Sequence, residues 1–285
     1  MGSAKDNKDG MELWFSETFG DIRAAWRVKE VLYRGRSKYQ DILILETVPF
    51  GRMLVLDGCV MTTERDECAY HEMLVHPGLL AHPKPEQVCV VGGGDGGTVR
   101  EVLKHPTVKR VVLAEIDEEV ISVSRRYLPS LASALGDARV EIVVGDGARY
   151  LADHPRSFDV VLSDSTDPVG PGAVLFGDAY FLSARNALRE GGVFVTQCKS
   201  LWTDAASVRD SAARLSRHFS TVLPYMAAIP TYPTGSWSFL IATQGLDARR
   251  TLAADRQALI CGTTRYYTPA HQSGAFAVPA FYAGA

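Results

Sequence analysis

The chain has 285 residues, of which 46% are hydrophobic and 22% charged, and its formal net charge is -3. This composition argues against a disordered or membrane-embedded protein, and the lack of a long Lys/Arg cluster argues against nucleic acid as a partner. The length suits one large domain with an appendage or two modest domains, and we expect small molecules as partners.

The N-terminus and the cysteines both favour a cytoplasmic protein. Residues 1–10, MGSAKDNKDG, lack the apolar core of a signal peptide, so we expect residues 1–11 to be a disordered tail. No apolar run approaches the roughly 18 residues of a membrane helix. The five cysteines are scattered without a C-x-x-C pair, which is typical of buried thiols in a reducing compartment.

The first part of the chain has the pattern of strands. Residues 26–35, 39–48 and 52–64 are rich in β-branched side chains and are separated by Gly, Pro or charged turns. They predict a small all-β N-terminal domain over residues 12–66. From Asp66 to Leu80 the pattern changes to that of an amphipathic helix, which ends at AHPKPEQ.

Residues 67–285 alternate between apolar strands and helices. The expected strands are residues 87–92, 110–116, 140–145, 158–163, 191–198, 222–229 and 236–244. The expected helices between them are residues 98–105, 118–127, 148–154, 179–190 and 204–219. Such alternation predicts an α/β fold with a Rossmann-like, mostly parallel sheet covered on both faces.

A glycine loop follows the first of these strands. In VCVVGGGDGGTVREV, Gly92, Gly94 and Gly97 form a G-x-G-x-x-G pattern, and Glu115 ends the next strand 21 residues after Gly94. An acid at that position can hold two ribose hydroxyl groups. The pattern favours a ribose-bearing ligand over a turn that only lets the strand and helix pack.

Asp95 within this loop indicates which nucleotide binds. Dinucleotide enzymes place a pyrophosphate at this helix N-terminus, and the Asp95 carboxylate would repel it, so NAD is disfavoured. With an S-adenosylmethionine-like ligand, Asp95 would attract the ammonium of the amino-acid tail and repel its carboxylate. Later in the chain, Asp146 can accept a hydrogen bond from the amino group of adenine and the Gly147 amide can donate one to a ring nitrogen. Asp146 suits a helix N-cap equally well.

The segment FDVVLSDSTDPVGPGAVLF, residues 158–176, ends a buried strand in Asp164 and Asp167. A strand end followed by a Pro-Gly loop often carries a ligand site, although Asp167-Pro168 is also ordinary turn chemistry. We expect the loop from Asp167 to Gly177 to close over bound substrates.

These motifs together resemble a known family. GGGDGG, AEID, GDG, DSTDPVGP and IPTY, with YQDI and TTERDECAYHEM before them, resemble the spermidine synthases, which are aminopropyltransferases of polyamine synthesis. The resemblance runs from Trp14 to Pro279. It implies a β-rich N-terminal domain, a methyltransferase-type catalytic domain and a homodimer or homotetramer. The implied reaction moves the aminopropyl group of decarboxylated S-adenosylmethionine, a co-substrate, to putrescine, giving spermidine and 5'-methylthioadenosine.

The resemblance also assigns roles to residues at matching positions. Asp164 is implied as the proton acceptor, with Tyr70 beside it in the amine channel. The nucleoside-binding set, including the glycine loop, is Gln40, Gly92, Gly94, Asp95, Glu115, Asp146, Gly147 and Pro171. The polyamine-binding set is His71, Asp95, Asp164, Asp167, Tyr232 and Trp237. Both reactants are cations, which explains why the cleft needs several carboxylates.

Some alternatives stay open. A methyltransferase would suit the glycine loop and Glu115, and a catalytically dead nucleoside or polyamine sensor would suit the same fold. Ala173 stands where many relatives carry Glu or Gln, so cadaverine, a longer polyamine or agmatine remain alternatives to putrescine. We expect no metal: His71 and His76 are five residues apart rather than the four of the helical zinc motif, and magnesium between Asp164 and Asp167 would have no phosphate to bind.

Overall fold

The computed structural model describes residues 12–166, 170–251 and 254–283. The expected tail over residues 1–11 and the expected site residue Asp167 lie outside this range. Within it, no helix is both long and apolar enough to cross a membrane.

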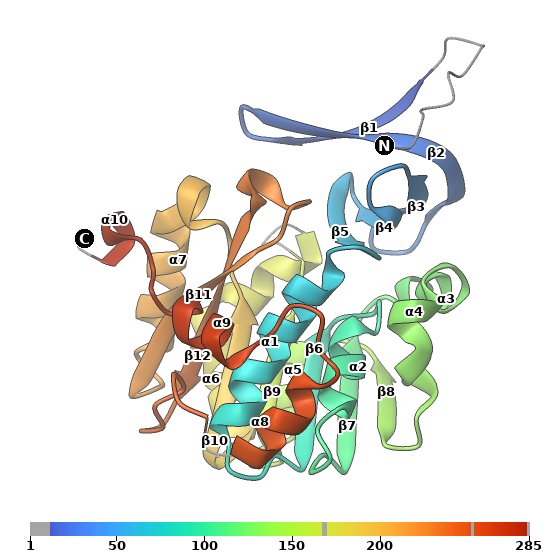
Figure 1. Cartoon of the computed structure of the whole chain (residues 1–285). Helices are drawn as coiled ribbons and strands as arrows, with labels where there is room; N and C mark the ends of the chain where they lie inside the picture. The colour runs from blue at the N-terminus through green and yellow to red at the C-terminus, as the bar shows by residue number, and fades with distance from the viewer. Residues whose placement is uncertain (1–11, 167–169, 252–253, 284–285) are drawn as a thin grey trace.

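The N-terminal part is an antiparallel sheet in which the strands follow their order in the chain (Figure 1). The strands are β1 (Leu13–Phe19), β2 (Ile22–Arg36), β3 (Asp41–Thr47), β4 (Gly51–Leu56) and β5 (Cys59–Thr63). The all-β prediction is therefore confirmed, but β1 had not been singled out and residues 52–64 form two strands instead of one. Asp57 and Gly58 separate them, with φ angles of 48° and 84°. Two positive φ angles define the two-residue hairpin turn that favours Asp-Gly.

The second sheet has the order β11-β12-β10-β9-β6-β7-β8. Its strands are β6 (Gln87–Gly92), β7 (Arg110–Glu115), β8 (Val140–Val144), β9 (Phe158–Asp164), β10 (Leu188–Gln197), β11 (Thr221–Ala228) and β12 (Ser236–Thr243). β6 to β10 run parallel, whereas β12 is antiparallel to both β10 and β11. The mostly parallel, Rossmann-like sheet is confirmed.

Helices cover both faces of this sheet. They are α1 (Glu67–Ala81), α2 (Gly97–Leu103), α3 (Glu118–Tyr127), α4 (Pro129–Ala132), α5 (Gly147–Asp153), α6 (Asp178–Ala187), α7 (Leu201–Leu215), α8 (Ala254–Cys261), α9 (Pro269–Ala275) and α10 (Ala280–Ala283). α1, α2, α8 and α9 contribute to the hydrophobic core on one face, and α5, α6 and α7 to the core on the other. The last three helices had no counterpart in the sequence analysis.

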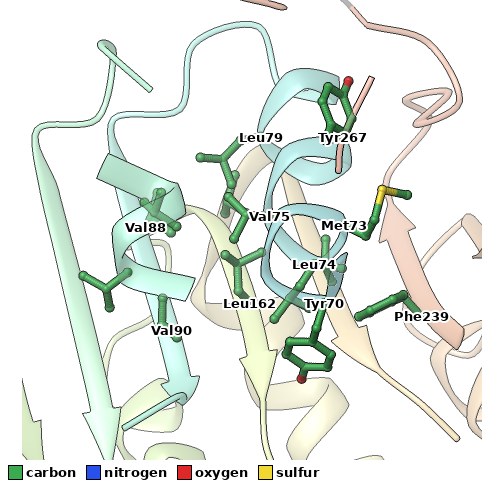
Figure 2. Close-up of a cluster of buried hydrophobic side chains, with 14 of the residues drawn as sticks. Tyr70, Met73, Leu74, Val75, Leu79, Val88, Val90, Leu162, Phe239 and Tyr267 are labelled. Carbon is green, nitrogen blue, oxygen red and sulfur yellow. The ribbon is translucent and has the colours of Figure 1, made fainter. Parts of the chain in front are cut away.

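α1 is not amphipathic, which corrects the expectation from its sequence. All 15 of its residues are buried. One side packs on the sheet, where Val75 lies near Val90 and Leu162 in the same cluster (Figure 2). The segment after β12 covers another side (Figure 1), so that even the polar positions of α1 are enclosed and need partners.

Arg256 and Glu72 are among the side chains that tie this C-terminal segment to α1. The guanidinium of Arg256, on α8, donates to the carbonyls of Leu79, His82 and Pro83 at 2.7, 2.6 and 3.1 Å, which satisfies the free carbonyls at the end of the helix. At the middle of α1, the Glu72 carboxylate accepts hydrogen bonds from three consecutive backbone amides, residues 265–267, at 2.7 to 2.8 Å.

The N-terminal sheet packs on the second part of the chain through α3 and α4. Buried apolar side chains of β3 and β4 form one cluster with those of the two helices: Ile42, Ile44, Leu54, Leu56, Val120, Val123, Leu128 and Leu131. The loop between β2 and β3 is thereby held at the N-terminus of α3, where Ser37 and Gln40 both donate to Asp117.

We expect Glu72→Gln to lower the free energy of unfolding by about 2 kcal/mol, because an amide oxygen and an NH2 group replace the two oxygens that accept these three bonds. Urea unfolding measures the change. The control is Glu190→Gln, an exposed position on β10, which should lie within about 0.5 kcal/mol of the unmodified protein. Equal stabilities of the two variants would show that Glu72 does not hold the C-terminal segment.

Candidate active site

The site lies where the strand order reverses. β6 has β9 on one side and β7 on the other, so a crevice opens at their carboxyl ends. Gly92 ends β6 and pairs with Asp164, which ends β9. A Cβ atom at Gly92, whose φ is 77°, would overlap the carbonyl of Asp164, and one at Gly93 would lie 2.6 Å from its carboxylate. Glycine is required here because the loop backbone lies directly against the acid.

Asp164 receives two hydroxyl hydrogen bonds. Tyr70 of α1 donates to Oδ1 at 2.7 Å and Thr98 of α2 donates to Oδ2 at 2.6 Å. Figure 2 shows Tyr70 at one end of the apolar cluster with its hydroxyl oxygen directed away from the other side chains. Burial and the nearby Asp95 carboxylate raise the pKa of Asp164 despite these bonds. Thr98 was missed, because a threonine at the start of a helix carries no motif of its own.

Asp95 lies in the loop between β6 and α2 and contacts His71. Its Oδ2 is 3.4 Å from His71 Nε2, and its Oδ1 accepts the Gly97 amide at 2.7 Å. Burial opposes ionisation of Asp95, but the imidazolium and the amide bond lower its pKa below the usual value. Burial likewise opposes the charged form of His71, and the carboxylates of Asp95 and Glu67 nevertheless raise its pKa well above the usual value. The two residues form a buried ion pair.

Glu115 ends β7 on the other side of the glycine loop. Its Oε2 accepts the Gly94 amide at 3.1 Å and its Oε1 accepts the Asp117 amide at 2.9 Å, while burial raises its pKa to about 7. Gln40 donates to the Asp117 side chain at 2.8 Å, which brings the N-terminal sheet to this part of the crevice. These residues, predicted to bind the nucleoside, therefore share one side of the site.

Asp146 is exposed and caps α5, since Oδ1 accepts the amides of Ala148 and Arg149 at 2.8 and 3.2 Å. The N-cap interpretation is confirmed, and contact with adenine stays a prediction. Gly147 is buried, and a Cβ there would lie 2.5 Å from Val91.

A small pocket lined by aromatic side chains adjoins Tyr70. Its lining comes from both sheets: Glu17, Phe19, Cys59, Val60, Met61, Tyr70, Ser165, Thr166, Gln197, Tyr232, Pro233 and Trp237. Tyr232 lies edge-on to Trp237, with ring centroids 4.9 Å apart, and Trp237 donates to Gln197 at 2.9 Å. The expected residues Tyr232 and Trp237 are thus brought together beside Tyr70.

Most of this lining was not anticipated as part of the site, and three of the unanticipated residues are informative. Glu17, on β1, is only 5% exposed and accepts the Val60 amide, but β1 had not been identified as a strand. Gln197 ends β10 and holds the chain after Asp164 by donating to the Ser165 carbonyl at 2.9 Å. Cys59 is exposed, contrary to the expectation of buried thiols, whereas Cys68, Cys89 and Cys198 are buried and Cys261 is partly exposed.

The two histidines of HEMLVH contact different side chains, and Arg100 connects the two groups. His76 contacts His105 at 3.0 Å and Glu101 at 3.1 Å. Arg100 donates to Glu101 and also to Glu67, the partner of His71. No group of three potential metal ligands occurs among the residues that the structure describes. The expected contacts of Asp167 and of the Pro171 side chain, and the Ala173 side chain, fall outside that description.

Comparison with known proteins agrees with this architecture. Residues 67–250 match the spermine/spermidine synthase domain, and residues 13–64 match the spermidine synthase tetramerisation domain. A polyamine aminopropyltransferase of Thermoanaerobacter sp. (strain X514) is 45% identical over 276 residues, covering 95% of this chain and 97% of the relative. One from Desulforudis audaxviator is 44% identical over 278 residues, covering 96% and 98%.

Solved structures of spermidine synthases are also similar to this chain. A spermidine synthase in complex with the transition state analogue AdoDATO superposes with a TM-score of 0.92 at 36% identity, over 94% of this chain and 93% of the other. Spermidine synthase from Thermotoga maritima gives 0.89 at 35% identity, over 94% and 92%. With two ordered family domains, relatives at full length and the acidic crevice in place, the chain belongs to the spermine/spermidine synthase family, the polyamine aminopropyltransferases.

Proposed function

We propose that this protein is a spermidine synthase, which transfers the aminopropyl group of decarboxylated S-adenosylmethionine to putrescine and releases 5'-methylthioadenosine. The observation that carries the proposal is the position of Asp164, which lies between the glycine loop and the aromatic pocket and is held by Tyr70 and Thr98. In this position Asp164 can act as a base toward an amine in the aromatic pocket while that amine attacks a nucleoside bound along the glycine loop.

The donor binds along the ends of β6, β7 and β8. Glu115 accepts the ribose hydroxyl groups, with Gln40 nearby, and Asp146 and Gly147 receive the adenine. Asp95 is held ionised by His71 in the same crevice and pairs with the donor's ammonium. Asp95 would repel the carboxylate of intact S-adenosylmethionine. This repulsion supports decarboxylated S-adenosylmethionine as the donor over S-adenosylmethionine.

The acceptor diamine lies in the pocket beside Tyr70. Its aromatic walls, Tyr70, Tyr232 and Trp237, contact the methylene chain and favour cations through their faces. One ammonium group loses its proton near Asp164, and the other pairs with the buried carboxylate of Glu17. One acid in the pocket lining, Glu17, and a second beside the pocket, Asp164, which is bound by Tyr70, fit a diamine, and Asp167 completes the set.

The chemical step is a displacement at carbon. The amine nitrogen uses its lone pair to form a bond to the methylene carbon next to the sulfonium, the carbon–sulfur bond breaks, and the electron pair stays on sulfur in methylthioadenosine. The proton lost from nitrogen passes to Asp164. A free amine and an aspartate differ in pKa by enough that direct transfer costs about 9 kcal/mol. Burial raises the pKa of Asp164 and the sulfonium lowers that of the amine, which narrows this gap.

The protein works as a homodimer or homotetramer in the cytoplasm under this proposal. The match of residues 13–64 to a tetramerisation domain supports assembly through the N-terminal sheet. Apolar side chains of β1 and β2 are correspondingly exposed: Leu13 and Trp14 at 51%, Ile22 at 42% and Val31 at 45%.

The reaction class is tested with purified protein and putrescine, using decarboxylated S-adenosylmethionine in one reaction and S-adenosylmethionine in the other. We expect methylthioadenosine and spermidine from the first and no product from the second. S-adenosylhomocysteine from the second would place the protein among methyltransferases. Nucleoside binding without turnover for putrescine, cadaverine, agmatine and spermidine would indicate a sensor.

Asp164→Asn should lower kcat by about 10²- to 10⁴-fold, since the amide cannot accept the proton. Binding of methylthioadenosine, measured by calorimetry, should change little. Asp153→Asn, at an exposed position on α5, is the control and should keep full activity. Near-normal turnover of the Asp164 variant would remove this residue from the chemistry.

Glu17→Gln should raise KM for putrescine by about 10- to 100-fold, as expected for one lost charge-assisted hydrogen bond. KM for the donor should stay the same. Glu30→Gln, an exposed position on β2 of the same sheet, is the matched control. An unchanged KM for putrescine would place the distal ammonium elsewhere.

A further inference from the structure

A buried carboxylate behind the site is unused by the reaction as described so far. Glu67 opens α1 and is 3% exposed, and it contacts His71, the partner of Asp95. We propose that Glu67 is a positioning residue that fixes the charge and orientation of His71 and thereby keeps both Asp95 and Asp164 ionised for catalysis. This inference rests on the proposed function and deepens it.

The imidazole of His71 faces a carboxylate at each nitrogen. Nδ1 is 2.7 Å from Glu67 Oε2, and Nε2 is 3.4 Å from Asp95 Oδ2. A neutral imidazole has one N–H, so one of its nitrogens would point a lone pair at a carboxylate. Because Glu67 and Asp95 both have lowered pKa values and are carboxylates, only the imidazolium form satisfies both contacts.

The ring is also confined on its faces and edges. A Cβ atom at Gly97 would overlap the ring of His71, so the helix α2 backbone lies directly against it. The Tyr70 ring lies edge-on at a centroid distance of 5.3 Å. These contacts restrict the plane of the ring, and the carboxylates at its two nitrogens hold it within that plane.

Glu67 is itself held as an anion from two other elements. Arg100 of α2 donates to its Oε2 at 2.7 Å, and Arg265 of the C-terminal segment reaches Oε1 at 3.3 Å. Burial opposes the ionisation of Glu67, but His71 and Arg100 together lower its pKa below the usual value. The carboxylate is therefore a fixed negative charge behind the ring.

Acidic groups surround His71, and two arginines stand behind one of them. They are Glu67 from its own helix, Asp95 from the β6–α2 loop, Asp164 from the end of β9, and, through Glu67, Arg100 from α2 and Arg265 from the C-terminal segment. The imidazolium lowers the pKa of both aspartates. Without the Glu67 charge, the imidazolium loses its proton more easily, and both aspartates lose the cation that opposes their mutual repulsion.

Two opposing effects follow from removing the Glu67 charge. Loss of a negative charge by itself lowers the pKa of the aspartates, whereas loss of the imidazolium proton raises it. The imidazolium contacts Asp95 at 3.4 Å, while Glu67 lies on the far side of the ring, so the nearer charge decides the sign. The pKa of Asp164 therefore rises when the Glu67 charge is removed. Activity needs the carboxylate form of Asp164, so on acidification the variant loses activity at a higher pH than the unmodified enzyme does.

Glu67→Gln tests this through the pH dependence of kcat/KM. We expect the acidic limb to move up by about one pH unit while the plateau at high pH stays within about tenfold of the unmodified enzyme. Glu67→Asp keeps the charge and should leave the limb near its original position. A uniform loss at every pH in both variants would reduce Glu67 to a structural residue and overturn the proposal.

Glu72→Gln is the matched control, because Glu72 lies on the same helix, is also buried and, among the residues that the structure describes, accepts its hydrogen bonds from backbone amides of residues 265–267. It should lower stability without moving the acidic limb. An equal movement of the limb in this control would assign the effect to loosening of α1, against the proposal.

An NMR titration measures the charge of the His71 ring directly and does not depend on enzyme turnover. The His71 signals are assigned by comparison with the His71→Asn variant. We expect an imidazolium at pH 7 in the unmodified protein and a pKa lower by at least about one unit in Glu67→Gln. A neutral ring at pH 7 in the unmodified protein would overturn the proposal. If no amine is turned over, the proposed function fails while this titration still gives its own answer.

Discussion

The structure depends on keeping several carboxylates close together in a crevice that is largely closed to water. Two like charges a few ångströms apart repel by roughly 4 kcal/mol even in a medium of intermediate polarity. The protein gives each acid a different environment. Asp95 has an imidazolium, Asp164 has two hydroxyl groups and a raised pKa, and Glu115 has two backbone amides and a pKa of about 7.

This arrangement matches the charge of the proposed substrates. The cationic donor and diamine add positive charge to that of His71, so binding relieves the repulsion among the acids. The split in pKa between Asp95 and Asp164 also fits the two roles that we propose, an ionised acid that anchors an ammonium and an acid with a raised pKa that accepts a proton. Under the proposal, one acid pair serves both recognition and chemistry.

The sequence predicts the parts of the fold that depend on local pattern. β6, β7 and β9 are apolar runs bounded by turns, and the site residues at their ends stand inside recognisable motifs. The Asp57-Gly58 turn was also readable from the sequence, because Asp-Gly is a hairpin signal, but it was overlooked within a longer β-rich run. The family resemblance added roles that no periodicity could supply.

The rest depends on contacts between distant segments. α1 looked amphipathic because its polar residues suggest a solvated face, yet those residues bind groups 25 to 198 positions away, such as Glu101, Arg100 and the amides of residues 265–267. Thr98, Glu17 and Glu67 gain their importance only from what the fold places beside them. No local pattern marks such residues, because their partners lie on other elements.

The hydrogen bonds of Glu72 and Arg256 join α1 to the C-terminal segment, and we call this set of contacts the clasp. The clasp has a consequence for the synthesis of this chain on the ribosome. α1 carries Tyr70 and His71, and the helix is enclosed only when residues 256–267 have joined it. During translation the glycine loop and Asp164 emerge well before this segment. We expect the nascent chain to form its central sheet early but to remain inactive until the clasp has been made, so that a ribosome that stalls before residue 256 releases no working enzyme.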